Sequence, residues 1–357
     1  MTPDKDVVLA PHTTLELGGR ARYFVVARTE SELTEALLWA SGHGVPTLLI
    51  GGGSNLVIGD EGFDGLAILI RTHGIVAVES DDHVQFTVAA GEPWDAFVAK
   101  VTTRGLWGVE CLSGIPGTTG ATPIQNVGAY GQEVCDTIVQ VRVFDRLSGA
   151  ITILDNTTCA FSYRDSLFKR DPDRHVVLDV SFRLSRTRPV SSSVYPELAR
   201  RLSELGLDGS SPQVVRDVVL QLRLAKSMVL VAEDENRRSV GSFFMNPIVT
   251  LQEANAVVTR ALAAGIVADA AQVPVFAVGD DRRKLSAGWL IDKCGLGKGF
   301  RLGTVGISSR HALALVHHGG GTTADLLALA RRVRTDVRNV FGVTLMPEPN
   351  LVGVSLA

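Results

Sequence analysis

Short runs of aliphatic residues alternate with longer amphipathic segments over the first third of the chain. The short runs are typical of strands, which we predict at 21–27, 46–50, 66–71 and 83–91. The longer segments carry apolar residues at helical spacing, which predicts helices at 29–44 and 92–105. The first helix has Thr29 or Ser31 as its N-cap and ends near Gly42 or Gly44.

The second half of the chain continues this mixture of strands and helices. Residues 140–154 predict a β-hairpin that turns near Ser148 and Gly149. A further strand is predicted at 176–185. Apolar periodicity then predicts helices at 211–228, 251–265 and 323–340.

Capping residues indicate the ends of two of these helices. Ser210 or Ser211 precedes the helix at 211–228, and Pro212 occupies its first turn. The last helix begins with the sequence TTAD and closes before Gly342. We find no internal repeat and no low-complexity segment, so domain borders have no linker to mark them.

Composition indicates a globular protein of more than one domain. The chain has 357 residues, 45% hydrophobic and 20% charged, which suggests two or three domains with ample core. The net charge is -3, and nothing in it favours nucleic acid as a partner. The most basic stretch, 331–338, lies on an expected helix and fits a solvated face. No apolar run has membrane-spanning length, and the N-terminus lacks the form of a secretory signal.

Cysteine and histidine positions give no metal site. The four cysteines (111, 135, 159 and 294) are too scattered for zinc and too few for a disulfide framework. We therefore expect reduced, mostly buried thiols in a cytoplasmic protein. His317 and His318 are adjacent, have no evident third ligand, and fit a turn better than a metal centre.

Three consecutive glycines, Gly51, Gly52 and Gly53, stand between two aliphatic runs. Glycine serves either a turn with positive φ or the close approach of a ligand to the backbone. A dinucleotide fingerprint requires glycine at position 56, which is Leu56, and the only GK pair is not followed by serine or threonine. A strand–turn–strand remains, whose exposed amides can hold an anion together with Ser54 and Asn55.

A second glycine-rich loop covers residues 113–131. It contains five glycines, two prolines and several hydroxyl and amide side chains. Loops of this length are uncommon as plain connectors. An Ω-loop that packs on itself is the structural alternative, but beside a second glycine turn we favour ligand binding.

These two loops resemble the FAD-binding half of the UDP-N-acetylenolpyruvoylglucosamine reductase (MurB) family. The family's other motifs follow in order along nearly the whole chain. They are TTLELGG (13–19), FSYRDSLFK (161–169), VGSFFMNP (240–247), SAGWLIDKCGLGKG (286–299), HALALV (311–316) and FGVTLMPEPNLVG (341–353). Several motifs in order are more specific than any one of them.

The resemblance implies an α+β fold of the vanillyl-alcohol-oxidase type. We expect an FAD-binding subdomain at 1–72, a second at 73–212 and a substrate-binding domain at 213–340, with 341–357 packing back near the first. No histidine lies in the glycine run, so we expect FAD to be held non-covalently. The expected cofactor-binding residues are Gly51, Gly52, Gly53, Ser54, Asn55, Leu56, Ser113, Gly114, Ile115, Pro116, Gly117, Thr119, Gly120, Ala121, Gln125, Asn126, Gly128, Ala129 and Tyr130.

The family reaction implies three catalytic residues. NADPH would reduce FAD, hydride would reach C3 of an enolpyruvyl ether, and a proton would reach C2. Arg164 matches the group that binds the substrate carboxylate, although an isolated arginine there would pair with Asp165. Ser242 matches the proton donor, and Glu348 the catalytic glutamate. Without the resemblance, Ser242 would be assigned to a helix cap or a turn, and Glu348 to an exposed turn.

Further residues match the family's substrate pocket. They are Tyr163, Tyr195, Lys226, Asn246 and His311. Lys226 would approach the diphosphate; the alternative is a solvated helix residue, and Tyr195 equally fits a packed aromatic.

The sequence departs from the best-studied branch of the family at two positions. His311 stands where that branch has glutamine, and Phe276 lies nearest to a loop tyrosine that contacts phosphate. Phe276 keeps the ring but lacks the hydroxyl, which puts that phosphate contact in doubt.

We therefore expect a monomeric cytoplasmic reductase of UDP-N-acetylglucosamine enolpyruvate that acts in cell-wall synthesis with FAD and NADPH, without nucleic-acid or membrane partners. Two alternatives stay open. One is another flavin oxidase or dehydrogenase of the same superfamily, which would need no UDP-sugar site. The other is a flavin- or nucleotide-binding sensor without turnover, against which Arg164, Ser242 and Glu348 argue together.

Overall fold

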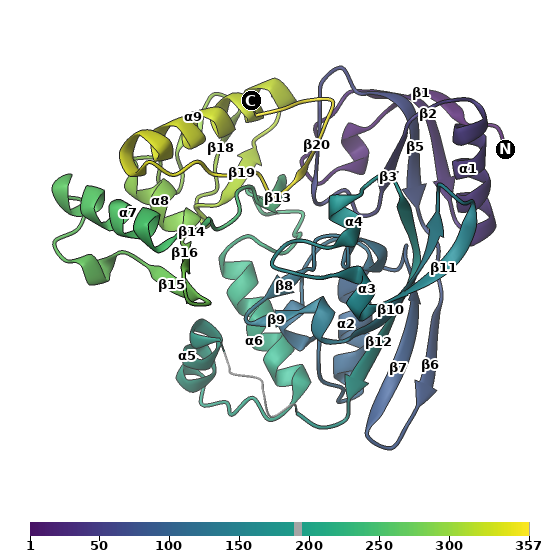
Figure 1. Ribbon diagram of the computed structural model, residues 1–357, viewed down its shortest axis with the longest axis horizontal. Helices are drawn as coiled ribbons and strands as arrows, with labels where there is room; N and C mark the ends of the chain where they lie inside the picture. The colour runs from purple at the N-terminus through teal and green to yellow at the C-terminus, as the bar shows by residue number, and fades with distance from the viewer. Residues whose placement is uncertain (189–194, 357) are drawn as a thin grey trace. The chain divides into compact units, whose positions relative to one another are not determined.

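The computed structural model describes residues 1–188 and 195–356 (Figure 1). Helices and strands are both abundant, which confirms the predicted α+β class. The chain forms two compact units, each assembled from separated segments. The first unit comprises Met1–Val7, Ala21–Gly53 and Asp64–Leu230, and the second comprises Val8–Arg20, Ser54–Phe63 and Val231–Ala357. The limits of these units differ from the predicted domain boundaries at 72, 212 and 340. The assignment of the predicted domains to cofactor and substrate binding stays a prediction.

One sheet of the first unit has the strand order β1-β2-β5-β3. The strands are β1 (Asp4–Val8), β2 (Arg20–Ala27), β5 (Phe63–Ile70) and β3 (Thr47–Ile50). β3 and β5 run parallel, with Thr47 opposite Leu66. The helix α1 (Glu30–Gly42) begins at Thr29, whose side chain accepts the Glu32 N–H, and its buried face shares one core with β5. Thr29 rather than Ser31 is therefore the N-cap.

The larger sheet of the first unit is antiparallel throughout. Its strands, in spatial order, are β11 (Ala150–Asp155), β10 (Ile138–Asp145), β12 (His175–Ser185), β7 (His83–Ala89) and β6 (Ile75–Glu79). β10 and β11 form the predicted hairpin, and Gly149 supplies a φ of +69° at its turn. The helix α2 (Trp94–Thr103) covers this sheet, with the Phe97 ring against Phe86 and Phe182.

Short helices and turns complete the first unit. They are α3 (Asn156–Cys159), α4 (Leu167–Arg170), α5 (Pro196–Glu204), α6 (Pro212–Ala225) and the small hairpin of β8 (Gly128–Ala129) and β9 (Gln132–Glu133). The Ser211 side chain caps α6, and Pro212 opens it, as predicted. α5 and α6 bury leucine and valine residues against Trp107. α5 was not predicted from the sequence.

The second unit contains two further sheets. The first has the order β13 (Ser239–Ser242), β19 (Ala314–His317), β18 (Val305–Ile307) and β17 (Arg301–Leu302). The other has the order β14 (Ile248–Thr250), β16 (Arg282–Leu285) and β15 (Val275–Val278). All of these pairs are antiparallel.

Three helices and one parallel strand pair enclose the core of the second unit. The helices are α7 (Leu251–Ala263), α8 (Ala287–Lys293) and α9 (Thr323–Phe341). α9 begins at a capping box and ends at Gly342 with a φ of +75°, as predicted. β20 (Asn350–Val352), near the end of the chain, pairs in parallel with β4 (Leu56–Ile58). Within the described residues, no helix combines the length and apolar character needed to cross a lipid bilayer.

Candidate active site

The glycine run after β3 touches the second glycine-rich loop inside the first unit. A Cβ atom on Gly51 would lie 2.4 Å from Thr118 Oγ1, and one on Gly52 would lie 2.6 Å from Gly117 Cα. Gly53 adopts a φ of +65°, which favours glycine. Contact between the two loops therefore explains the absent side chains of Gly51 and Gly52, so these two positions do not by themselves indicate a ligand.

Hydroxyl groups of the second loop attach it to main-chain carbonyls of preceding segments. Ser113 Oγ donates to the Glu110 carbonyl at 2.6 Å, and Thr119 Oγ1 donates to the Glu92 carbonyl at 3.2 Å. Both side chains are fully buried. Gly120 lies against Ala90, where a Cβ atom would come within 2.5 Å of its methyl group. These contacts fix the conformation of the loop.

Asn126 braces the end of this loop. Its amide Nδ2 donates to Glu133 Oε2 at 2.7 Å and to the Ser162 carbonyl at 3.1 Å, while Oδ1 accepts the Cys135 N–H at 3.2 Å. The side chain is fully buried and the backbone has a φ of +44°. The other expected cofactor residues of this loop and of β8 are Ile115, Pro116, Ala121, Gln125 and Ala129.

Arg164 turns towards the same loop. Its guanidinium donates to the Asn126 carbonyl at 3.2 Å and to the Gly128 carbonyl at 2.5 Å, and it lies 5.4 Å from the centre of the Tyr163 ring. Asp165 forms an ion pair with Arg170, the last residue of α4. Arg164 holds a φ of +54°, a strained conformation for a side chain of its size. Arg164 is thus fixed beside the proposed cofactor loop.

Lys226 gathers with two tyrosines at the end of α6. Its Nζ lies 2.6 Å from Glu197 Oε2 and 5.8 Å from the centre of the Tyr130 ring. Tyr130 meets Tyr195 edge to face at 5.8 Å, and burial raises the pKa of Tyr130 to about 12. Two expected substrate residues and one expected cofactor residue thus lie together, with Lys226 paired rather than merely solvated.

Sequence reasoning missed Arg223, which lies one turn before Lys226 on α6. Its Nη2 donates to the Met228 carbonyl at 2.6 Å and to the Gly114 carbonyl at 3.4 Å, whereas its buried Nε–H has no partner among the described residues. Burial lowers the pKa of its guanidinium to about 10. A fixed positive charge therefore lies against the Gly114 turn. The only sign of it in the sequence is the position of Arg223 one helical turn before Lys226.

Ser242 and Glu348 are brought together by the main chain of the second unit. Ser242 ends β13 opposite Ala314 of β19. The Glu348 N–H donates to the carbonyl of Phe243, the residue after Ser242, at 2.9 Å. Phe243 is itself fully buried, which anchors the junction. A hydroxyl and a carboxylate thus lie on neighbouring segments.

Part of the expected cofactor site adjoins the same segment. The Asn350 N–H donates to the Asn55 carbonyl at 2.9 Å, and Asn350 pairs with Leu56 in the β20–β4 ladder. The stretch from Ser54 to Leu56 is therefore attached to the strand that follows Glu348. Arg164 and Lys226 belong to the first unit, so their convergence with Ser242 stays a prediction.

Two other expected substrate residues lie in the second unit. Asn246 Oδ1 accepts the Ala287 N–H at 3.0 Å, at the start of α8. The His311 carbonyl accepts the Ala314 N–H at 3.1 Å, in the turn before β19. Phe276 lies on β15 with 53% of its surface exposed.

His317 is hydrogen-bonded to main-chain groups, and the four cysteines form no disulfide. His317 Nε2 accepts the Gly321 N–H at 3.1 Å, so its Nδ1–H donates to the Leu15 carbonyl at 3.0 Å. The cysteines are free thiols, and burial raises the pKa of Cys111 and of Cys159 to about 12. No group of three metal-binding side chains occurs within the described ranges.

Comparison with known proteins assigns both halves of the chain. A family model described as UDP-N-acetylenolpyruvoylglucosamine reductase, C-terminal domain, matches residues 233–352, and one described as FAD binding domain matches residues 21–155. The solved UDP-N-acetylenolpyruvylglucosamine reductase of Thermus caldophilus is 25% identical, with a TM-score of 0.65 over 99% of both chains. The expected FAD-binding fold and the resemblance are confirmed.

Curated relatives cover nearly the whole chain. A UDP-N-acetylenolpyruvoylglucosamine reductase of Streptomyces coelicolor is 50% identical over 98% of this chain and 90% of its own length. One of Thermobifida fusca is 47% identical over 99% and 98%. The chain belongs to the UDP-N-acetylenolpyruvoylglucosamine reductase family and is an FAD-dependent oxidoreductase of peptidoglycan synthesis.

Proposed function

We propose that this chain reduces UDP-N-acetylglucosamine enolpyruvate to UDP-N-acetylmuramate with NADPH, in the cytoplasm and as a monomer. The observation that carries the proposal is 50% identity to a named reductase over 98% of the chain. The placement of Ser242 beside Glu348 and of Arg164 beside the glycine-rich loop supports it.

The residues of the first unit fit FAD. Two glycine turns lie against each other, and the buried guanidinium of Arg223 sets a positive charge beside the Gly114 turn. Such a charge suits a cofactor that carries a diphosphate and an electron-accepting ring. FAD, when bound, supplies hydride transfer between NADPH and the substrate. No histidine occurs from Gly51 to Leu56, which favours a non-covalent cofactor.

Arg164 acts on the substrate carboxylate in this proposal. When hydride reaches C3 of the enolpyruvyl group, negative charge develops at C2 and spreads into that carboxylate. A guanidinium stays protonated and binds a carboxylate through two parallel N–H bonds. A donor fixed in advance in this way lowers the barrier by roughly 3–4 kcal/mol.

Ser242 and Glu348 act on the proton. Serine is a weak acid, so its hydroxyl protonates C2 only because the carbanion there is strongly basic. Glu348, on the adjoining segment, would share a proton with the substrate or with the oxyanion that Ser242 leaves. Around this centre, Lys226 would bind the diphosphate, and Tyr163, Tyr195, Asn246 and His311 would contact the rest of the substrate.

The exchange Ser242→Ala tests the proton assignment. We expect NADPH to bleach the flavin at the wild-type rate, while return of colour with the enolpyruvyl sugar slows by about 10²- to 10⁴-fold. Stopped-flow absorbance measures the two half-reactions separately. Ser239→Ala, on the same strand, is the control and should leave both rates unchanged. Normal substrate reduction by Ser242→Ala would show that another group supplies the proton.

Binding of the UDP-sugar separates this proposal from a flavin oxidase of the same superfamily. We expect calorimetric titration of the oxidised protein to detect the enolpyruvyl sugar nucleotide. A protein that binds FAD and turns over another small molecule, yet ignores the UDP-sugar, would favour the oxidase.

A further inference from the structure

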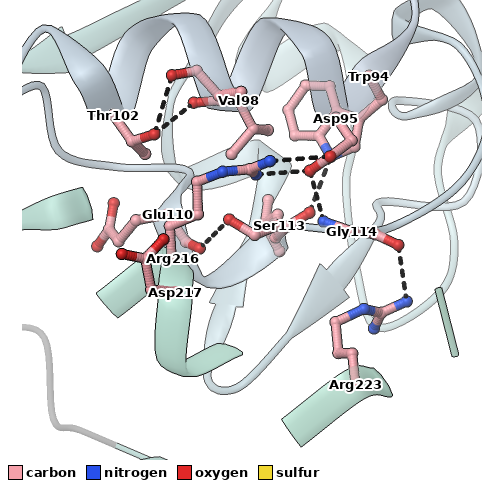
Figure 2. A network of polar contacts seen from close by, with 12 residues as sticks. Trp94, Asp95, Val98, Thr102, Glu110, Ser113, Gly114, Arg216, Asp217 and Arg223 are labelled. Atoms are coloured by element: carbon pink, nitrogen blue, oxygen red, sulfur yellow. Dashed lines mark hydrogen bonds and ion pairs between the residues drawn. The ribbon is translucent and has the colours of Figure 1, made fainter. Parts of the chain in front are cut away.

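The turn at Gly114 is held by polar contacts on both of its peptide groups (Figure 2). Its N–H donates to Asp95 Oδ1 at 2.6 Å, and its carbonyl accepts from Arg223 Nη2 at 3.4 Å. Gly114 has a φ of +71°, and a Cβ atom there would lie 2.8 Å from Leu220 Cδ2. Neither polar group of Gly114 is therefore available for a phosphate in this conformation.

The Asp95 carboxylate is in turn held by hydrogen bonds from a buried arginine. Arg216 Nη1 and Nη2 donate to Asp95 Oδ1 and Oδ2 at 2.6 and 2.9 Å, and only 8% of Arg216 is exposed. This is the bidentate geometry in which arginine holds a carboxylate most firmly. Burial raises the pKa of Asp95, but the bonds from Arg216 and Gly114 outweigh it, and the pKa lies below its ordinary value.

The helix α6 thus holds the Gly114 turn through two arginines. Arg216 and Arg223 are seven residues apart on α6, which places them on one face of the helix. Arg216 reaches Gly114 through Asp95, in the first turn of α2, and Arg223 reaches it directly. Figure 2 shows both arginines approaching the turn from α6 with Asp95 between α2 and the loop.

We infer that Asp95 is a positioning residue: with Arg216, it fixes the Gly114 turn and the Arg223 charge in the geometry that binds the flavin cofactor. The inference rests on the proposed role of this turn in FAD binding. Loss of the Asp95 charge frees Arg216 and lets the turn relax, although Asp95 touches no reacting atom. FAD then binds more weakly, because part of the binding free energy is used to order the loop when the cofactor binds.

The test is the dissociation constant of FAD for apo-protein prepared from the full chain, measured by flavin fluorescence. Asp95→Asn keeps the shape of the side chain and an oxygen for the Gly114 N–H but loses the charge. We expect it to bind FAD about tenfold more weakly or worse.

Asp179→Asn is the matched control. Asp179 lies in the same unit and accepts from Arg142 Nε at 2.6 Å, on strands β12 and β10 of the large sheet. Asp179→Asn likewise removes the charge of a carboxylate that binds an arginine, and it should bind FAD as the wild type does. Equal FAD affinity in the two variants overturns the inference but leaves the proposed function intact, whereas a wild type that binds no FAD overturns the function.

A double-mutant cycle separates positioning from general stability. Asp95 acts through Gly114, so Asp95→Asn and Gly114→Ala together should weaken FAD binding by less than the product of their separate effects. Asp179→Asn with Gly114→Ala should show no such coupling, and independent effects of Asp95 and Gly114 would contradict the mechanism. If Asp95→Asn does not fold, Asp95→Glu replaces it: it keeps the charge but shifts the carboxylate, and wild-type FAD affinity in it overturns the inference.

Discussion

Several buried polar side chains near the proposed cofactor site are hydrogen-bonded to neighbouring main-chain groups. Ser113, Thr119 and Asn126 are fully buried, and their side-chain bonds hold the loop rather than reach outward. A buried polar group without a partner is costly, so these bonds are needed before any ligand arrives. These side chains therefore fix the shape of the loop before a ligand binds.

Gly52 provides the clearest prediction at the residue scale. Gly52→Ala places a methyl group 2.6 Å from the Gly117 Cα, a backbone atom that cannot rotate away. We expect the free energy of unfolding to fall by about 1–3 kcal/mol. Urea denaturation followed by circular dichroism measures this.

The control for Gly52→Ala is Gly42→Ala. Gly42 is the last residue of α1, and outside its chain neighbours and the adjacent backbone of its own helix no atom lies within 4 Å of the position its Cβ would take. Alanine is the better helix former, so this exchange should leave stability equal or higher by up to about 1 kcal/mol. Equal losses in the two variants would show that the loop contact is soft.

Elements with local signals were predicted from the sequence, and those that depend on distant partners were not. α1, α6 and α9 have apolar periodicity and caps within their own segments, at Thr29, Ser211 and Thr322. β13 is four residues long and pairs irregularly with β19, so no local period marks it. α8 has only seven residues, too few for periodicity to identify. α5 has nine residues and buries Leu198 and Leu202 at helical spacing, a local signal that our prediction missed. Likewise, glycine content marked the proposed binding loops, but the contact from Asp95 to Arg216 spans 121 residues and left no local signal.

Helix α9 has a second cap that no local sequence rule reveals. The Asp60 carboxylate accepts the Thr323 N–H at 2.7 Å and the Ala324 N–H at 2.9 Å, both at the helix N-terminus. A carboxylate there satisfies unpaired donors and suits the helix dipole. Asp60→Ala should lower the free energy of unfolding by about 1–2 kcal/mol in urea denaturation.

Asp64→Ala is the matched control for Asp60→Ala. Asp64 is highly exposed, and its ion pair with Arg22 is 3.5 Å long at the surface. Exposed pairs of this kind contribute under about 1 kcal/mol. A loss at Asp64 as large as that at Asp60 would mean that the cap adds nothing beyond a surface charge.

The path of the chain ties the two units together covalently. The chain passes between them five times, after Val7, Arg20, Gly53, Phe63 and Leu230. The second unit therefore depends on segments 8–20 and 54–63, although the matched C-terminal domain begins only at residue 233. The family boundary at residue 233 therefore does not coincide with the limits of a compact unit.

An isolated fragment of residues 231–356 should consequently fail to fold. It lacks Leu15, Leu17 and Val57, which are buried in the same core as α9, and it leaves β20 without its partner β4. Each buried aliphatic side chain contributes about 1.5–3 kcal/mol, so their loss approaches the roughly 5–15 kcal/mol that stabilises a whole domain. We expect narrow amide dispersion in a proton–nitrogen NMR spectrum, where the full chain gives dispersed peaks. Native-like dispersion in the fragment would show that segments 8–20 and 54–63 are not needed for this core to fold.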